Sequence, residues 1–209
     1  MAGLFVTFEG PDGSGKTTQI NLLKNHLELL GLDIVLTREP GGTVISEKIR
    51  EILLDKKHVE MDYICEALLY AASRAQHVAE LIIPSLDAGK IVVCDRFVDS
   101  SIVYQGIGRK LGDSVKLIND IAIRGCMPDA TFLIKVDPKT GKSRRDIAEM
   151  DRLDLEEINY HSLVYDAYEK LQLENPKRIT SFDGNETIEQ INKKIIGKIT
   201  EILLERKVI

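Results

Sequence analysis

The residues best suited to chemistry lie near the start of the chain, in the run Gly-Pro-Asp-Gly-Ser-Gly-Lys-Thr that begins at Gly10. This run fits the phosphate-loop pattern G-x-x-x-x-G-K-[ST], whose glycines let backbone N–H groups turn toward a polyphosphate at the start of a helix. The pattern assigns Lys16 to the β- and γ-phosphates and the Thr17 hydroxyl to Mg²⁺. We therefore expect a bound nucleotide to contact Gly10, Pro11, Asp12, Gly13, Ser14, Gly15, Lys16, Thr17 and Thr18.

A second pair of reactive side chains, Asp95 and Arg96, follows directly after the apolar run 91–94. Such a run is typical of a central strand that is buried on both faces of a parallel sheet. A carboxylate at its end can hold Mg²⁺ through water, and the neighbouring guanidinium can bind a phosphate with two hydrogen bonds. The alternative is a surface salt bridge after a strand. We favour the catalytic interpretation because phosphoryl transfer needs an acid at this place.

An aromatic ring and a cation lie four residues apart in Tyr70 and Arg74, so both point from one face of a helix. Together they could stack on a nucleobase and donate hydrogen bonds to it. Taken alone, the same pair is more often a core tyrosine beside a surface arginine.

The polar stretch 138–154 carries three arginines, Arg144, Arg145 and Arg152. The phosphate loop has no Arg or Lys at positions 11–14, and phosphoryl transfer needs cations around the transferred group as well as exclusion of water. We therefore interpret this stretch as a lid that supplies catalytic arginines. The alternative is a solvated loop.

Strands and helices alternate along the whole chain, which predicts an α/β fold with one parallel sheet of about five strands and helices on both faces. Strands are expected at 4–8, 34–37, 91–94, 131–136 and 178–182. Helices are expected at 17–27, 44–54, 60–87 with a break near Pro84, from Ser100, 114–124, 155–173, and after the capping box Thr187–Gln190. Ligands of such sheets bind at the carboxyl ends of the strands, where the phosphate loop, Arg38-Glu39 and Asp95-Arg96 all fall.

The 209 residues predict one domain, with the lid at approximately 138–154. A net charge of −5 argues against a nucleic-acid polymer as partner. We expect no membrane segment, because no apolar run approaches the length of a bilayer span. The three cysteines are far apart and indicate neither a disulfide framework nor a zinc site, which fits a reducing cytoplasm.

Three segments together resemble the bacterial thymidylate (dTMP) kinases, and the resemblance runs essentially from end to end of the chain. The first is Phe8-Glu9-Gly10 through Thr18, which is similar to the phosphate loop of that family. The second is Thr37-Arg38-Glu39-Pro40-Gly41-Gly42-Thr43, and the third runs from Asp95-Arg96-Phe97 through Tyr104-Gln105-Gly106. A phosphate loop alone is shared by many families, whereas these three in this order and spacing are highly specific.

The resemblance implies a P-loop NTPase-type fold, ATP and Mg²⁺ as cofactors, dTMP as acceptor, and a homodimer. It implies that dTMP contacts Asp12, Arg38, Glu39, Pro40, Arg50, Tyr70, Arg74, Arg96, Ser101, Tyr104 and Gln105. Tyr70 takes the place of an aromatic residue, often Phe, that stacks on thymine; Arg74, Ser101 and Gln105 bind the base, and Tyr104 packs beneath the deoxyribose. The catalytic set is Lys16, Arg96, Asp12, Arg144, Arg145 and Arg152, and the metal ligands are Thr17 and Asp95.

We conclude from the sequence that the chain transfers phosphate from ATP to dTMP, giving dTDP. Three alternatives stay open. A deoxynucleoside kinase would leave Arg50 and Arg96 without an acceptor phosphate, and a kinase of another nucleoside monophosphate would differ only at the base site. A P-loop switch ATPase would leave the arginine-rich lid unexplained, and the chain has no Asn-Lys-x-Asp guanine motif.

Overall fold

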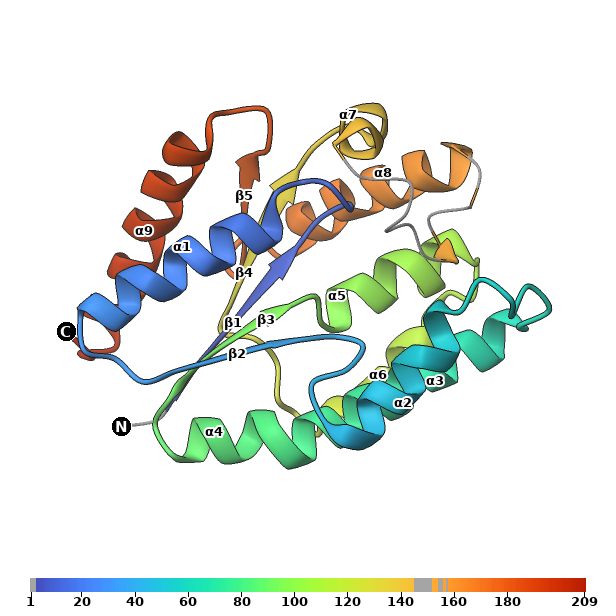
Figure 1. Ribbon diagram of the computed structural model, residues 1–209, viewed down its shortest axis with the longest axis horizontal. Helices are drawn as coiled ribbons and strands as arrows, with labels where there is room; N and C mark the ends of the chain where they lie inside the picture. Colours follow the sequence, from blue (N-terminus) through green and yellow to red (C-terminus); the bar gives the residue numbers. More distant parts are fainter. Residues whose placement is uncertain (1–2, 145–151, 154–155, 157) are drawn as a thin grey trace.

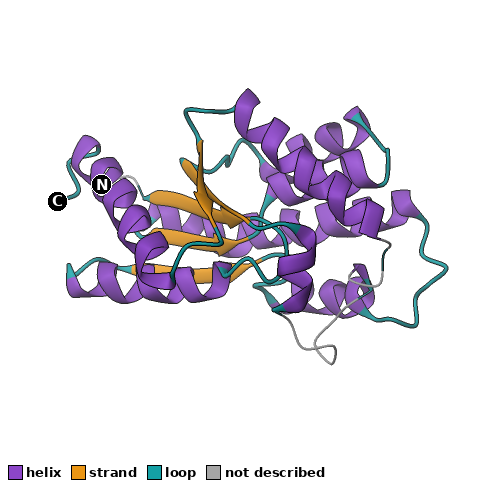
Figure 2. Ribbon diagram, turned by 90° about the horizontal axis from the view of Figure 1, so that it is seen from above, coloured by secondary structure: helices purple, strands orange, loops and turns teal. Residues whose placement is uncertain are grey.

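Five parallel strands form one sheet in the order β2-β3-β1-β4-β5, as the sequence predicts (Figures 1 and 2). The computed structural model describes residues 3–144, 152–153, 156 and 158–209. The strands are β1 (Leu4–Glu9), β2 (Ile34–Arg38), β3 (Ile91–Asp95), β4 (Ala130–Lys135) and β5 (Ile179–Asp183). All five predicted strands are confirmed, because runs of apolar and β-branched residues between turns leave few other conformations open.

Helices connect the strands and cover both faces of the sheet (Figure 1). They are α1 (Lys16–Leu29), α2 (Val44–Leu54), α3 (Tyr63–His77), α4 (Ile83–Asp87), α5 (Val98–Ser101), α6 (Asp113–Ile123), α7 (Pro138–Ser143), α8 (Ile158–Glu174) and α9 (Ile188–Glu205). Two π-helical segments, η1 (Val78–Ile82) and η2 (Ile102–Gly108), continue α3 and α5. The described part of the chain has no helix that is long and apolar enough to span a membrane.

Alternating residues of β1 pack into two different cores. Val6 and Phe8 face α1 and α9, where Leu23 and Ile195 are fully buried. Phe5 faces the opposite way, into a cluster with Val92 and Phe97 from β3 and the turn after it. This period of two fixes the register of the central strand, and its last residue, Glu9, therefore lies on the same face as Phe5.

Local patterns predicted most helices but not α7 or the irregular helical ends. The sequence predicts no helix within the polar stretch 138–154, yet Pro138–Ser143 forms a short helix with Asp137 accepting hydrogen bonds from the amides of Lys139 and Thr140. The C-terminal helix begins after its capping box at Thr187, as expected. Along this helix Ile191, Ile195, Ile199 and Leu203 are buried, whereas Ile188 is half exposed.

Candidate active site

One cavity of about 720 Å³ lies over the carboxyl ends of β1, β2 and β3. It joins the phosphate loop to the helices that follow the other strands, which is where parallel sheets bind their ligands. Its lining includes most of the predicted site: Asp12, Gly13, Ser14, Gly15, Lys16, Thr17, Thr18, Arg38, Glu39, Pro40, Arg50, Tyr70, Arg74, Asp95, Arg96, Ser101, Tyr104, Gln105 and Arg144. Gly10, Pro11 and Arg152 are not part of this wall.

The phosphate loop holds its lysine close to its own backbone. Lys16 is buried, and its Nζ donates to the carbonyl oxygens of Gly10 and Pro11 at 3.0 Å each. Burial, followed by the charge of Arg96, lowers the pKa of Lys16. Two carbonyl oxygens of its own loop therefore hold the Lys16 ammonium.

Two glycines in this loop are required by space and by backbone angle. Gly10 has a φ of +133°, and a Cβ there would lie 2.2 Å from the carbonyl oxygen of Ile134. Gly13 has a φ of +76°, and its Cβ would lie 2.1 Å from the carbonyl oxygen of Gly141 in α7. A Cβ on Gly141 would in turn lie 2.7 Å from the carbonyl oxygen of Asp12. The loop and α7 therefore touch backbone to backbone.

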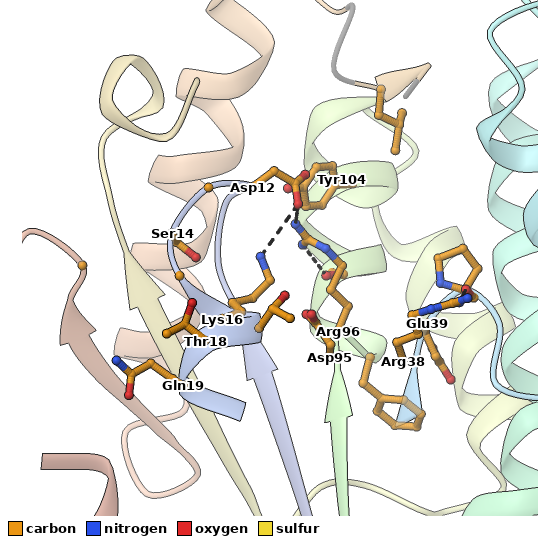
Figure 3. Close-up of a pocket in the computed structure, with 18 of the residues that line it drawn as sticks. Asp12, Ser14, Lys16, Thr18, Gln19, Arg38, Glu39, Asp95, Arg96 and Tyr104 are labelled. Atoms are coloured by element: carbon orange, nitrogen blue, oxygen red, sulfur yellow. Dashed lines mark hydrogen bonds and ion pairs between the residues drawn. The ribbon is translucent and has the colours of Figure 1, made fainter. Parts of the chain in front are cut away.

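Arg96 is the centre of the cavity. Its Nη2 donates to Asp12 Oδ1 at 2.7 Å, and the same carboxylate lies 3.8 Å from Lys16 Nζ (Figure 3). The guanidinium lies over the ring of Tyr104, 5.2 Å from its centroid. Arg96 has a φ of +67°, a left-handed conformation that a residue with a side chain adopts only when its surroundings impose it. Two predicted site residues 84 positions apart are thus brought into direct contact.

The residues assigned to Mg²⁺ fit a hard cation. Asp95 and Thr17 both line the cavity, and Asp95 Oδ1 is buried without a hydrogen-bond partner in the described part of the chain. A buried carboxylate oxygen that lacks a donor is costly unless a cation or a water meets it. Carboxylate, hydroxyl and phosphate oxygens with several waters are the ligands that Mg²⁺ prefers. The described residues contain no group of three or more His, Cys, Asp or Glu side chains that could hold a metal ion.

The predicted base site is a buried corner formed by α3 and η2. Tyr70 and Arg74 both line the cavity, so their expected placement on one helix face is confirmed. Arg74 is no surface arginine, since it is only 1% exposed. It donates to Glu39 Oε2 at 2.7 Å, to Ser101 Oγ at 3.0 Å, to the Phe97 carbonyl at 3.0 Å, and to Asn119 Oδ1. These bonds use four of its five N–H groups and fix its orientation.

Two further arginines lie between this corner and Arg96. Arg50 Nη1 and Arg38 Nη1 both donate to the carbonyl oxygen of Pro40, at 2.9 and 3.0 Å, and Arg38 also pairs with Glu47 at 2.9 Å. The Glu39–Pro40 peptide bond is cis. Arg38, Arg50 and Arg96 therefore place three positive charges along one wall of the cavity, which suits a phosphate group.

The predicted lid arginines divide among different places. Arg144 lines the cavity and donates to the Gly184 carbonyl at 2.9 Å. Arg152 is buried elsewhere: its Nη2 donates to Glu66 Oε2 at 2.6 Å and its Nε to the Leu53 carbonyl at 3.1 Å. Arg145 lies outside the described residues, as does much of the predicted lid.

Sequence reasoning missed Glu9, which organises the turn that carries Arg96. Its buried carboxylate accepts from the backbone N–H of Phe97 at 2.8 Å, from Ser100 Oγ at 2.6 Å, and from the Tyr168 hydroxyl at 2.8 Å. Burial first, then the charge of Asp99, raises the pKa of Glu9 to about 7. The only local signal was an acidic residue that ends an otherwise apolar strand.

A phosphate loop at the end of a central parallel strand, facing three arginines and an acid on the neighbouring strands, defines a P-loop phosphotransferase. The profile of the thymidylate kinase family matches residues 8–195. Thymidylate kinase from Oceanobacillus iheyensis is 46% identical over 99% of this chain and 94% of its own length. That from Thermoanaerobacter sp. strain X514 is 47% identical over 97% of this chain and 100% of its own.

The crystal structure of thymidylate kinase from Ehrlichia chaffeensis superposes with a TM-score of 0.76 at 35% identity, covering 96% of this chain and 99% of that one. The chain belongs to the thymidylate kinase family. Its reaction is the ATP-dependent phosphorylation of dTMP, with Mg²⁺ as the metal cofactor.

Proposed function

We propose that the cavity holds ATP and dTMP end to end and that the residues around Arg96 carry the phosphoryl transfer between them. The observation that carries this assignment is the continuity of the cavity: the phosphate loop and the buried corner of Tyr70 and Arg74 open into the same space, with Arg96 between them. In-line transfer requires donor and acceptor phosphates to meet, and catalysis is then mainly a matter of positioning and electrostatics.

The donor side is formed by the phosphate loop and the segments beside it. In the proposed complex, Lys16 turns from the loop carbonyls to the β- and γ-phosphates, and the loop amides hold the remaining oxygens. Thr17 and Asp95 would hold Mg²⁺, which would neutralise negative charge on the phosphates. Arg144, on the Gly184 carbonyl, is the described lid arginine placed to reach the triphosphate.

The acceptor side reaches from Arg96 to the base corner. Tyr70 stacks on thymine, Tyr104 lies beneath the deoxyribose, and Arg74 binds the base edge through the N–H that the protein does not use. Arg38, Arg50 and Arg96 hold the acceptor phosphate, and the Pro40 carbonyl sets the geometry of Arg38 and Arg50. Glu39 and Ser101 orient Arg74. Asp12 shares Arg96 with the acceptor and orients it.

In the reaction, an oxygen of the acceptor phosphate attacks the γ-phosphorus. A new P–O bond forms as the bond to the bridging oxygen breaks, and ADP leaves. Lys16, Arg96 and Arg144 surround the equatorial oxygens and stabilise the charge that spreads over them. The protein forms no covalent bond itself.

The cluster of acceptor-side arginines argues against the rival functions. A deoxynucleoside kinase binds an uncharged hydroxyl at this place, which would leave Arg38, Arg50 and Arg96 as unneeded buried or half-buried charge. A P-loop switch ATPase would need no site for a second nucleotide, whereas Tyr70 and Gln105 line the same cavity as the phosphate loop.

A panel of monophosphates with ATP and Mg²⁺ tests the proposed function by product identity. We expect kcat/KM to be highest for dTMP, with dUMP the nearest competitor, because a missing methyl group costs about 1–3 kcal/mol in an apolar pocket. dCMP, dGMP and AMP should be poorer. Turnover of thymidine faster than dTMP, or ATP hydrolysis that ignores the acceptor, would contradict the assignment.

We also propose that the protein is a homodimer that pairs through α2, α3 and α6. These helices pack side by side (Figure 1), and they leave large apolar side chains in solvent: Val44, Ile45, Ile52, Ile64, Leu68, Leu117 and Ile121. Ile45 and Ile52, on α2, are 52% and 44% exposed. Exposed apolar side chains on neighbouring helices are typical of an interface, and a twofold pair of copies would bury them.

Ile121→Glu is expected to convert a dimer into a monomer, because it places a charge among these exposed apolar side chains. Light scattering coupled to size-exclusion chromatography measures the mass directly. Leu29→Glu, on α1 across the sheet and 87% exposed, is the matched control and should leave the mass unchanged. A wild-type chain that runs as a monomer at micromolar concentration contradicts the proposal.

We further propose that the chain is a single domain over residues 1–209, with the lid at approximately 138–154, and that it works in the cytoplasm. The support for a reducing compartment is that Cys65, Cys94 and Cys126 are all free.

A further inference from the structure

Glu66 is a buried carboxylate that touches a predicted base-site residue but does not itself line the cavity. It lies in α3 with no solvent exposure. Its Oε1 accepts from Gln105 Nε2 at 2.9 Å, and its Oε2 accepts from Arg152 Nη2 at 2.6 Å. Arg109 donates to both oxygens, at 3.3 Å from Nε and 3.2 Å from Nη2. One carboxylate therefore holds two arginines and one amide.

This carboxylate is fixed in its charged, accepting form. Burial alone would raise the pKa of Glu66, but the hydrogen bonds from Gln105 and Arg109 and the charge of Arg109 outweigh it and lower that pKa. Arg109 is itself held between the rings of Tyr63 and Tyr160, with 4.4 and 4.9 Å from the guanidinium carbon to the ring centroids. Its Nη1 pairs with Glu156 at 2.7 Å. An ionised carboxylate has no proton to donate.

The consequence for Gln105 is a single amide orientation. The NH₂ and carbonyl ends of a glutamine amide are nearly equal in shape. If the amide could turn over, Gln105 could present either its donor or its acceptor to a base. Against Glu66, only the NH₂ end can form a hydrogen bond. Gln105 lines the cavity, and no described residue donates to its carbonyl oxygen, so that oxygen can accept a hydrogen bond from a ligand. Arg74, which can only donate, supplies the opposite polarity beside it.

We propose that Glu66 is a positioning residue for substrate choice: it holds the Gln105 amide with its oxygen toward the base, so that the site accepts N3–H of thymine and rejects cytosine. Thymine offers an acceptor at O4 beside a donor at N3. Cytosine offers the reverse, an amine at C4 beside an N3 that only accepts. The inference rests on the proposed function and adds the residue that sets the polarity of the base edge.

Glu66→Gln tests this inference, because a neutral amide at that position can donate as well as accept and frees Gln105 to turn over. We expect the ratio of kcat/KM for dTMP to that for dCMP to fall by about tenfold or more, the size of one mismatched hydrogen bond in a dry site. The dTMP loss should appear in KM, with kcat at saturating dTMP largely kept. A merely structural role would lower both substrates together and leave the ratio unchanged.

Glu156→Gln is the matched control, because it removes a carboxylate from the same Arg109 without touching Gln105; its dTMP to dCMP ratio should equal that of the wild type. In a Gln105→Leu background, Glu66→Gln should no longer change the ratio, since the two act through one contact. If Glu66→Gln does not fold, Glu66→Asp takes its place. It keeps the charge for both arginines while withdrawing the carboxylate from Gln105, and the same fall in the ratio is expected.

A wild-type preference for dTMP that survives Glu66→Gln, or Glu66→Asp, overturns the inference and leaves the proposed function standing. A wild-type enzyme that does not prefer dTMP over dCMP overturns the proposed base site, and the role of Glu66 falls with it. The wild-type enzyme therefore tests the proposed base site, and the Glu66 variants test the role of Glu66.

Discussion

Lys16→Ala is expected to lower kcat by at least about 10²-fold, comparable to the loss of one preorganised electrostatic donor in an active site. The lysine is buried within the phosphate loop, and its ammonium has only the carbonyl oxygens of Gly10 and Pro11 within 3.0 Å as hydrogen-bond acceptors among the described residues. In the proposed complex, phosphate oxygens of ATP replace those carbonyl oxygens as the acceptors of the Lys16 hydrogen bonds. The ammonium would then stabilise the negative charge on the transferred phosphoryl group in the ground state and in the transition state. Water cannot replace this positive charge in the variant.

Steady-state turnover with saturating ATP and dTMP measures this loss, and circular dichroism confirms that the variant is folded. Lys24→Ala in the same helix is the matched control: its side chain is half exposed and pairs with Glu28 at 3.5 Å, so turnover should be unchanged. A folded Lys16→Ala protein with near-normal turnover would remove the phosphate loop from the mechanism.

Tyr70→Ala is expected to weaken dTMP binding by about ten- to a hundredfold, since stacking of a base on an aromatic ring contributes roughly 1–3 kcal/mol. The ring is nearly buried at the wall of the cavity, one turn before Arg74. Truncation leaves a gap that the base cannot fill, whereas the hydrogen bonds of Arg74 to Glu39 and Ser101 persist. Isothermal titration with dTMP gives the Kd.

Tyr70→Phe is the matched control, because it keeps the ring and removes only the hydroxyl. Its Kd for dTMP should stay within a fewfold of the wild type. ATP affinity should be unaffected in both variants. Equal loss in Tyr70→Phe and Tyr70→Ala would show that the hydroxyl, not the ring, binds the substrate.

The parts of the site that the sequence predicted are those whose geometry is local or follows from sheet topology. The glycine and lysine spacing of the phosphate loop fixes its own conformation, as Gly10 and Gly13 illustrate. Arg38 and Arg96 follow adjacent parallel strands, so they had to meet at one edge. That convergence needed no knowledge of long-range contacts beyond the sheet itself.

The parts that the sequence could not predict depend on pairing between distant buried polar groups. Glu9 meets Tyr168 across 159 positions, and Glu66 meets Arg152 across 86. In the sequence each acid resembles a surface residue of its helix or strand. The periodicity of apolar residues identifies buried apolar faces, but it does not indicate which charged side chains are buried together. The prediction that Arg152 reaches the phosphates depended on the position of the lid, which neither apolar periodicity nor sheet topology fixes.

The backbone contact between Gly13 and Gly141 limits how the stretch 138–154 can be redesigned. A protein engineer who wished to exchange this lid for one of another length or charge would treat it as a surface insert, free to vary. Position 141 cannot vary freely, because the Cβ of any other residue would press on the backbone carbonyl oxygen of Asp12. The side-chain carboxylate of the same Asp12 orients Arg96. A grafted lid would therefore need to keep a glycine at position 141.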